Sequence, residues 1–315
     1  MANLLRPAIL AAARSSRIKS AITHAPGTRS LVTRFVAGEA RDDVLVATRA
    51  LLDSGRAVSI DHLGEDTTDA EQARAIVAEY RSLLGDLAEL DEAPGSHRLE
   101  VSVKLSALGQ ALPVDGDKIA LDHARELCEA ALAAGVWVSV DAEDHTTTDG
   151  ALSIVSALRA DYPWVGAVLQ AYLRRTESDC RDLAGPGSRV RLCKGAYREP
   201  ASVAFQSAAE VDDSYRRCLA ILMDGDGYPM VASHDPAMID AATAEARRTG
   251  RGPDRYEHQM LYGIRDVEQQ RLADSGARMR VYVPYGAQWY GYFMRRLAER
   301  PANLTFFLRS LTTRT

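Results

Sequence analysis

One short stretch of the chain has the residue types and spacing that suit binding of a carboxylate. Tyr292, Arg295, Arg296 and Glu299 fall at positions i, i+3, i+4 and i+7, so on a helix all four project from one side. Two neighbouring guanidiniums repel unless an anion lies between them, and a carboxylate is the smallest anion that both can grip. The alternative is a solvated surface pair neutralised by Glu299.

Three further polar segments each follow a short apolar run. Lys104 could bind a carboxylate, form a Schiff base or pair with Asp141. RLCKGAY joins Arg191 to a Lys-Gly turn at Lys194, whose backbone N–H groups could contact a phosphate or the edge of a flavin ring. His234 follows VAS, where a hydrogen-bonded core histidine and a ligand contact are equally compatible with the pattern.

Several classes of site are not indicated. The histidines form no HExxH or HxH, and the four cysteines are scattered, so neither a metal site nor a disulfide framework is predicted. The chain has no GxGxxG, no GxxxxGK[ST] and no GxSxG. A net charge of −5 gives no electrostatic footprint for nucleic acid. Together these features predict a cytoplasmic protein in a reducing environment.

Charge is uneven at the start of the chain. From Met1 to Gly38 there is no Asp or Glu, whereas six Lys or Arg residues are present. Such a basic, amphipathic segment is compatible with the first helices of the fold, with contact at the inner face of a membrane, or with a cleaved presequence. We expect an N-terminal helical segment over residues 1–45 and a single catalytic domain over residues 46–315.

The elements that must position these side chains repeat along the chain. Short apolar, β-branched runs alternate with amphipathic helical patterns, which is typical of βα units and a parallel sheet. Eight runs are predicted as strands, at residues 57–61, 99–105, 136–142, 167–173, 189–195, 229–234, 256–261 and 279–284. Eight alternations favour one (βα)₈ barrel, in the α/β class, over two doubly wound domains.

A barrel places chemistry at the carboxyl ends of its strands. We therefore expect polar side chains at those ends to meet on one rim, where inward-pointing polar groups need a ligand or one another. The candidates at the eight strand ends include His62, Lys104, Asp141, Gln170, Arg191, Ser233, Gln259, Tyr282 and Tyr285.

Nine segments in this order resemble the monofunctional proline dehydrogenases, a module also found in bifunctional proline utilisation flavoenzymes. They are HLGED, SVKLSALG, VDAED, VLQAYLRRT, VRLCKGAY, ASHD, QMLYG, VPYG and YFMRRLAERPANL. The resemblance runs from about residue 57 to the end of the chain. It implies a distorted (βα)₈ barrel with N-terminal helices, and FAD-dependent oxidation of L-proline to Δ¹-pyrroline-5-carboxylate with electrons passed to a membrane quinone. It also implies functional coupling to a pyrroline-5-carboxylate dehydrogenase.

The resemblance also implies a role for particular residues. Asp141 and Arg191 match catalytic positions, and Glu65 matches the acidic residue that pairs with the first arginine of the RR pair. The substrate would be bound by Lys104, Arg295, Arg296, Tyr282, Tyr292 and Leu261. The FAD would be contacted by Ala142, Gln170, Arg191, Lys194, Gly195, Ala196, Ser233, His234 and Glu299. No metal is implied.

Two other functions fit the residues alone. An aldolase-like barrel would use Lys104 or Lys194 as a Schiff-base nucleophile. A non-catalytic barrel would bind a small amino acid and would never reduce a flavin.

Overall fold

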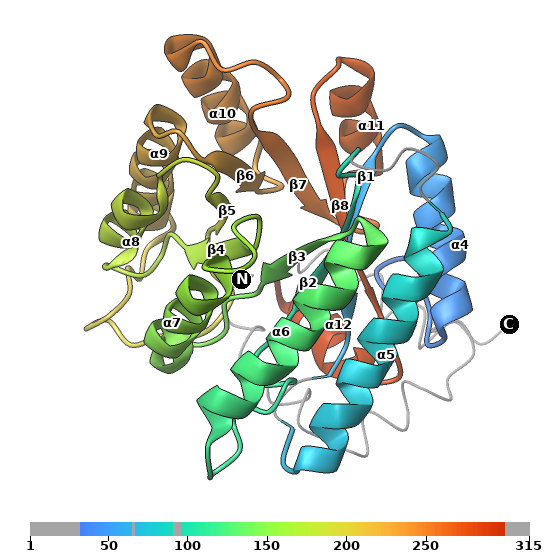
Figure 1. The fold of residues 1–315 in the computed structure, drawn as a ribbon. Helices are drawn as coiled ribbons and strands as arrows, with labels where there is room; N and C mark the ends of the chain where they lie inside the picture. The colour runs from blue at the N-terminus through green and yellow to red at the C-terminus, as the bar shows by residue number, and fades with distance from the viewer. Residues whose placement is uncertain (1–31, 65–66, 91–95, 300–315) are drawn as a thin grey trace, which may run out of the picture.

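A computed structural model describes residues 32–64, 67–90 and 96–299, with the backbone alone for residues 295–299. Parallel strands close into a barrel in chain order, with β8 beside β1 (Figure 1). The strands are β1 Ala57–His62, β2 Leu99–Val103, β3 Trp137–Val140, β4 Gly166–Gln170, β5 Arg189–Cys193, β6 Tyr228–Ala232, β7 Glu257–Leu261 and β8 Met279–Tyr285. The predicted (βα)₈ fold class is confirmed, and each of the eight strands lies where its run was found.

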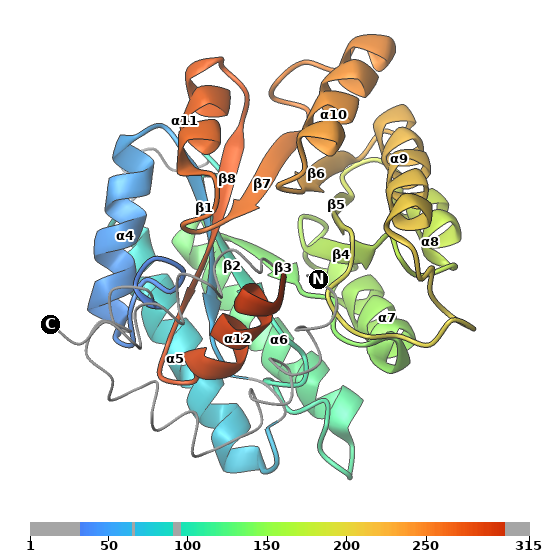
Figure 2. The ribbon, with the colours of Figure 1, turned by 180° about the vertical axis from the view of Figure 1, so that it is seen from behind.

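Helices surround the strands in both views (Figures 1 and 2). They are α4 Arg41–Asp53, α5 Ala70–Ala88, α6 Gly116–Ala134, α7 Thr148–Arg159, α8 Thr176–Leu183, α9 Ala208–Asp224, α10 Pro236–Thr249, α11 Asp266–Asp274 and α12 Trp289–Glu299, with a 3₁₀ turn η1 at His145–Thr147. None of the helices in the described part of the chain has both the length and the apolar character needed to cross a membrane. Residues 1–31 lie outside the described residues, so the N-terminal helical segment and its membrane contact stay predictions.

The apolar core lies between the strands and the helices. Val58 and Ile60 of β1, like Val101 of β2, point outward and pack with helix side chains such as Leu84 and Leu127. This alternation is the sequence pattern of a strand with one apolar face. Burial on the outer face therefore holds the barrel together.

The inner face of the barrel is polar. The residues between the outward positions are buried but charged or hydroxylated, among them Ser59, Glu100, Ser102 and Arg191. Bulky aliphatic side chains usually fill this space in a (βα)₈ barrel. Here hydrogen bonds and ion pairs fill it instead.

A second apolar cluster seats α12 against the chain that precedes α4. Phe35 and Val36 pack with Phe293 and Trp289 in this cluster. The indole N–H of Trp289 donates to Glu39 at 2.8 Å. These contacts fix the helix that carries Tyr292, as well as Arg295 and Arg296, whose side chains lie outside the described residues.

Candidate active site

A cavity of about 400 Å³ lies at the carboxyl ends of the strands. Every strand of the barrel, or the residues just after it, contributes to its wall, and Tyr292 of α12 adds an aromatic ring. The volume falls within the range of small-molecule sites. Its lining is mixed, with charged side chains in or directly after β1, β2, β3 and β5 and apolar ones from β4 and β7.

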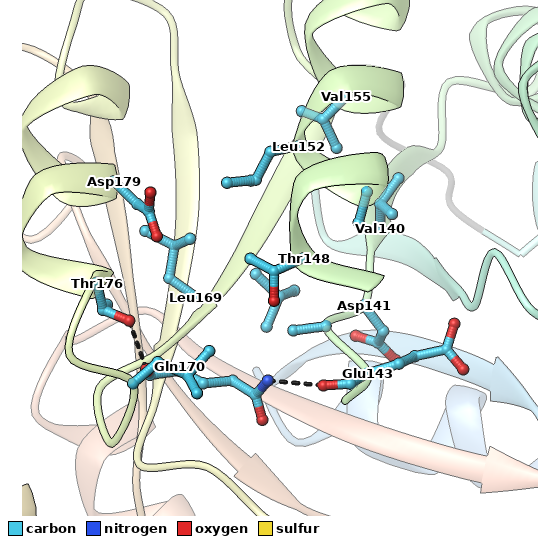
Figure 3. Close-up of a pocket in the computed structure, with 14 residues that line it drawn as sticks. Val140, Asp141, Glu143, Thr148, Leu152, Val155, Leu169, Gln170, Thr176 and Asp179 are labelled. Atoms are coloured by element: carbon cyan, nitrogen blue, oxygen red, sulfur yellow. Dashed lines mark hydrogen bonds between the residues drawn. The ribbon is translucent and has the colours of Figure 1, made fainter. Parts of the chain in front are cut away.

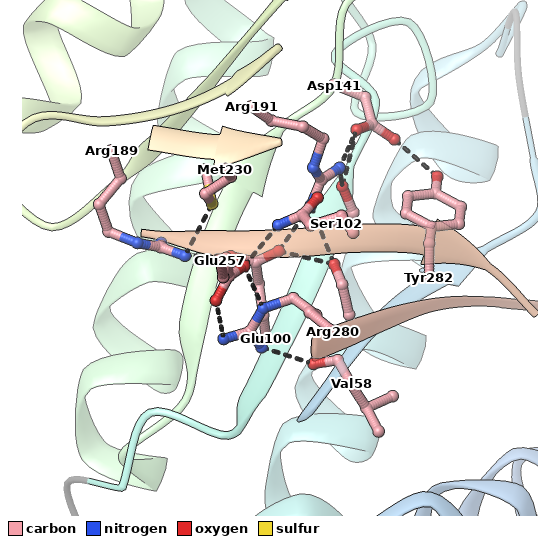
Figure 4. A network of polar contacts seen from close by, with 12 residues as sticks. Val58, Glu100, Ser102, Asp141, Arg189, Arg191, Met230, Glu257, Arg280 and Tyr282 are labelled. Atoms are coloured by element: carbon pink, nitrogen blue, oxygen red, sulfur yellow. Dashed lines mark hydrogen bonds and ion pairs between the residues drawn. The ribbon is translucent and has the colours of Figure 1, made fainter. Parts of the chain in front are cut away.

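Asp141, which directly follows β3, is the centre of a hydrogen-bond network at the cavity floor (Figure 4). Its Oδ1 accepts from Nη1 of Arg191 and from the Ser102 hydroxyl, both at 2.8 Å. Its Oδ2 accepts from the Tyr282 hydroxyl at 2.7 Å. Burial, together with the Asp141 carboxylate, raises the pKa of Tyr282 well above its usual range, so this phenol stays a donor.

Lys104 has a different main partner from the one considered in the sequence. Its ammonium donates to both carboxylate oxygens of Asp61, at 2.8 and 2.7 Å, whereas Asp141 Oδ2 lies 3.5 Å away. Asp61 lines the cavity and was missed in the sequence. The available signal was its place in β1, two residues after Ser59, where an alternating strand points it inward.

Beneath the cavity, Glu100 binds two arginines (Figure 4). Its Oε1 accepts from Nη2 of Arg191 at 2.6 Å and from the Ser59 hydroxyl at 2.7 Å, and its Oε2 accepts from Arg189. Burial opposes the ionised form of Glu100, but the guanidiniums of Arg189, Arg280 and Arg191 outweigh burial and hold its pKa well below the usual range. Burial also opposes the cation of Arg191, yet Glu100 and Asp141 raise its pKa. Both groups therefore stay charged.

A second carboxylate of the same layer, Glu257, serves a different arginine. Arg280 donates to Glu257 through Nε at 2.7 Å and through Nη2 at 3.1 Å. Gln259 and Tyr228 also donate to this carboxylate. Glu257 and Arg280 are fully buried and close the inner end of the network.

The loop after β5 brings backbone close to the cavity. Gly195 has φ +114°, and a Cβ there would lie 2.3 Å from the ring of Tyr172. A side chain at this position would therefore push the loop off the ring. The ammonium of Lys194 is held by Asp212 at 2.5 Å and by Asp235 at 2.7 Å.

Two residues after β6 complete this wall. His234 Nε2 accepts from the backbone N–H of Leu261 at 2.9 Å, which leaves Nδ1 as the protonated nitrogen of a neutral ring. The Ser233 hydroxyl accepts from the backbone N–H of Asp235 at 3.2 Å, and Asp235 also caps α10. The loop geometry thus fixes both side chains.

A smaller cavity of about 20 Å³ lies between β3, α7, β4 and α8, with room for about one water (Figure 3). Figure 3 shows Gln170 reaching across to the main chain of Glu143, where its Nε2 donates at 2.8 Å. The Glu143 carboxylate in turn accepts from the backbone N–H of Ser106 at 3.0 Å. This cavity is too small for an organic ligand, but the bonds around it hold Gln170 at the edge of the larger one.

The structure brings the described candidates together. Those that line the larger cavity are Lys104, Asp141, Ala142, Gln170, Arg191, Lys194, Gly195, Ala196, Ser233, His234, Leu261, Tyr282 and Tyr292. Glu65 and the side chains of Arg295, Arg296 and Glu299 lie outside the described residues. Their predicted roles stay predictions.

Two of the strand-end candidates do not belong to the rim. The ring of His62 packs against Tyr80 and Tyr285, and the Tyr285 hydroxyl donates to Glu79 of α5 at 2.8 Å. The expectation that they join the site was wrong, because both occupy outward positions in the alternation of β1 and β8.

A closed barrel with a charged interior and a cavity that draws on every strand defines a (βα)₈ enzyme with a polar active site. Residues 44–309 match the family described as proline dehydrogenase. The chain is 37% identical to proline dehydrogenase 2 of Bacillus subtilis (strain 168) over 286 residues, covering 91% of this chain and 92% of the relative. It is 38% identical to the proline dehydrogenase of Deinococcus radiodurans over 286 residues, covering 90% of each.

One solved structure has a similar fold over most of this chain. Proline utilization A from Bdellovibrio bacteriovorus, inactivated by N-propargylglycine, superposes with a TM-score of 0.77 and 27% identity, covering 86% of this chain and 32% of that chain. The chain belongs to the proline dehydrogenase family, whose activity is the first step of proline catabolism. The resemblance noted in the sequence is thereby confirmed.

Proposed function

We propose that the protein oxidises L-proline to Δ¹-pyrroline-5-carboxylate with FAD and passes the electrons to a quinone. The observation that carries the proposal is the cavity itself, in which carboxylate, guanidinium and phenol groups meet beside a glycine loop and apolar side chains. The reaction takes a hydride from the ring carbon next to nitrogen and a proton from the amine. FAD, when bound, would supply the acceptor for the two electrons.

Two features of the cavity fit a flavin. Gly195 lets the loop after β5 lie directly against Tyr172, so that the backbone of Gly195 forms part of the cavity wall, where a ring system can approach it closely. Arg191 also lines the cavity, and Glu100 and Asp141 hold its guanidinium in place, so a fixed cation stands in the wall beside the space for an electron-accepting ring. We assign the cofactor contacts to Ala142, Gln170, Arg191, Lys194, Gly195, Ala196, Ser233, His234 and Glu299.

Lys194 would contribute little net charge to that site. Asp212 and Asp235 neutralise its ammonium, so its contact with a cofactor would be a hydrogen bond within a balanced cluster. His234 would donate through Nδ1, since Nε2 already accepts from Leu261.

The substrate carboxylate is assigned chiefly to Arg295 and Arg296. Lys104, Lys194 and Arg191 each already contact carboxylates, so the described cations of the cavity carry no surplus charge for an acid. The two arginines follow Tyr292 by three and four residues on α12, the spacing that places them on its side of the helix. Lys104 would add a hydrogen bond, and Glu65 would pair with Arg295 as a gate.

Asp141 and Arg191 are the proposed catalytic pair. Asp141 Oδ2 accepts one hydrogen bond from Tyr282 and retains acceptor capacity, with which it can orient the N–H of the neutral amine. Arg191, fixed beside it, would stabilise negative charge that develops on the electron acceptor. Tyr282, Tyr292 and Leu261 would enclose the ring and exclude water.

The ion pairs of both lysines argue against the aldolase-like alternative. A Schiff-base lysine needs a neutral amine, whereas Lys104 and Lys194 are each held by two carboxylates.

The absorption spectrum of the purified protein tests the proposed function. It should show a flavin band at about 450 nm that proline bleaches under anaerobic conditions. A colourless protein that borohydride traps on a keto substrate would support the aldolase; proline binding without bleaching would support a binding protein.

The proposed quinone acceptor is supported by the charge of the N-terminal segment. The basic segment from Met1 to Gly38 could dock on an anionic membrane that contains the quinone. Removing the first ~20 residues should then weaken liposome binding and quinone turnover while activity with a soluble dye is retained. Loss of folded protein would instead assign the segment to the fold.

The product is a reactive cyclic imine, so we expect functional coupling to a pyrroline-5-carboxylate dehydrogenase.

A further inference from the structure

The barrel interior holds a balanced set of buried charges. Its carboxylates are Asp61, Glu100, Asp141 and Glu257, and its cations are Lys104, Arg189, Arg191 and Arg280. Asp61, Asp141, Lys104 and Arg191 line the cavity, whereas the other four lie beneath it. Of the two deeper carboxylates, Glu100 binds a charged residue of the cavity wall, Arg191, whereas Glu257 contacts the wall only through the amide of Gln259.

Glu100 gives Arg191 a second anchor. Nη1 of Arg191 is held by Asp141 and Ser102, both at 2.8 Å, and Nη2 is held by Glu100 at 2.6 Å and Ser59 at 3.1 Å. Two anchors on different nitrogens fix the plane of a guanidinium, whereas one would leave it able to turn. The orientation of the Arg191 guanidinium therefore depends on both anchors.

We propose that Glu100 is a positioning residue of the active site, which holds the Arg191 guanidinium against Asp141 in the wall of the cavity. The inference rests on the proposed function, because it takes Arg191 to act on the reacting groups. Glu100 itself is fully buried and acts only through Arg191.

The chain offers a matched control in the same layer. Glu257 is also a fully buried carboxylate that binds an arginine, but that arginine is Arg280, which bonds to the backbone of Val58 and His97 at the closed end. Substituting either glutamate by glutamine puts an amide N–H next to a guanidinium donor and should lower the melting temperature. A merely structural role for Glu100 therefore predicts the same functional result for both variants.

The test compares Glu100→Gln with Glu257→Gln in the full chain, using proline and a soluble dye. For Glu100→Gln we expect kcat to fall by about 10²-fold, the loss typical of a misplaced reacting group, while the KM for proline changes little. The dissociation constant of FAD from the apoprotein, measured by flavin fluorescence, should rise about tenfold, since Arg191 would contact the cofactor. Glu257→Gln should retain both values within about threefold.

If Glu100→Gln does not fold, a smaller pair of changes serves the same purpose. Ser59 bridges Glu100 and Arg191, whereas the hydroxyl of Ser139, equally buried, has no partner among the described residues. Ser59→Ala should then lower kcat by about tenfold and Ser139→Ala should not.

The outcomes separate the two claims. A wild type whose flavin proline does not reduce would overturn the proposed function. With an active wild type, equal losses in the two glutamine variants, or in the two alanine variants, would overturn the positioning role of Glu100 alone.

Discussion

The hydroxyl of Tyr282 provides a sharp test of the site, because Tyr282→Phe removes one hydrogen bond and keeps the ring. That hydroxyl donates to Asp141 Oδ2 at 2.7 Å, and its distance from the Lys104 ammonium is 3.4 Å. A hydrogen bond to a charged group contributes about 1.5–3 kcal/mol. If Asp141 needs this bond to orient the substrate amine, the loss corresponds to about 10- to 150-fold in kcat/KM.

Tyr285→Phe is the matched control. It makes the same chemical change three residues after Tyr282, at an outward position of β8, where the hydroxyl donates to Glu79 of α5 at 2.8 Å, away from the cavity. The assay is the rate at which proline bleaches the flavin, with thermal melts of both variants. A Tyr282→Phe variant at the wild-type rate, or equal losses in both variants, would refute the role given to the Tyr282–Asp141 bond.

The arginine pair, the ring of Tyr282 and a buried histidine each allow a further test. Arg295→Met and Arg296→Met should each raise the KM for proline by about 10²-fold while FAD stays bound; an unchanged KM in both would make the pair a surface feature. The kcat/KM of the wild type should be about 10- to 200-fold higher for L-proline than for trans-4-hydroxy-L-proline. The Tyr282→Ser variant should bring these two kcat/KM values closer together, which steady-state kinetics on both substrates would measure. Burial lowers the pKa of His258 from 6.5 to about 4. The unfolded chain therefore binds more protons between these values, so this contribution to stability is complete above about pH 6.5 and is lost as the pH falls towards 4. Urea unfolding at several pH values should show a weaker acid dependence in His258→Leu, and identical slopes would contradict the assignment.

The strands were predictable because each has an apolar outer face, but their ends were not. The runs predicted at 136–142 and 167–173 correspond to Trp137–Val140 and Gly166–Gln170. β3 and β4 pair only through Ser139 with Gly166 and Val140 with Ala167. The apolar pattern continues into the following loops, whereas a strand ends where its ladder partners end.

The cavity wall was largely predictable, since a barrel brings the carboxyl ends of its strands to one rim. The partner of Lys104 was missed, although a barrel places β1 beside β2 and the alternation of β1 points Asp61 inward, because the sequence interpretation took His62 and not Asp61 as the polar end of that strand. The alternation of Glu100, Ser102 and Lys104 with valines did carry a signal for the inner network. Which arginine each carboxylate binds depends on barrel closure.

The balanced interior also limits how such a barrel can change during evolution. Removing one member of a buried ion pair leaves an uncompensated charge and costs about 3–5 kcal/mol, whereas replacing both members can be nearly neutral. That loss is a large fraction of the stability of a typical domain. Positions 257 and 280 bind mainly each other, so we expect them to be substituted together. Glu100 pairs with Arg189 and Arg191, and Arg191 also pairs with Asp141, so loss of Glu100 would leave Arg189 as the buried cation that needs a compensating change.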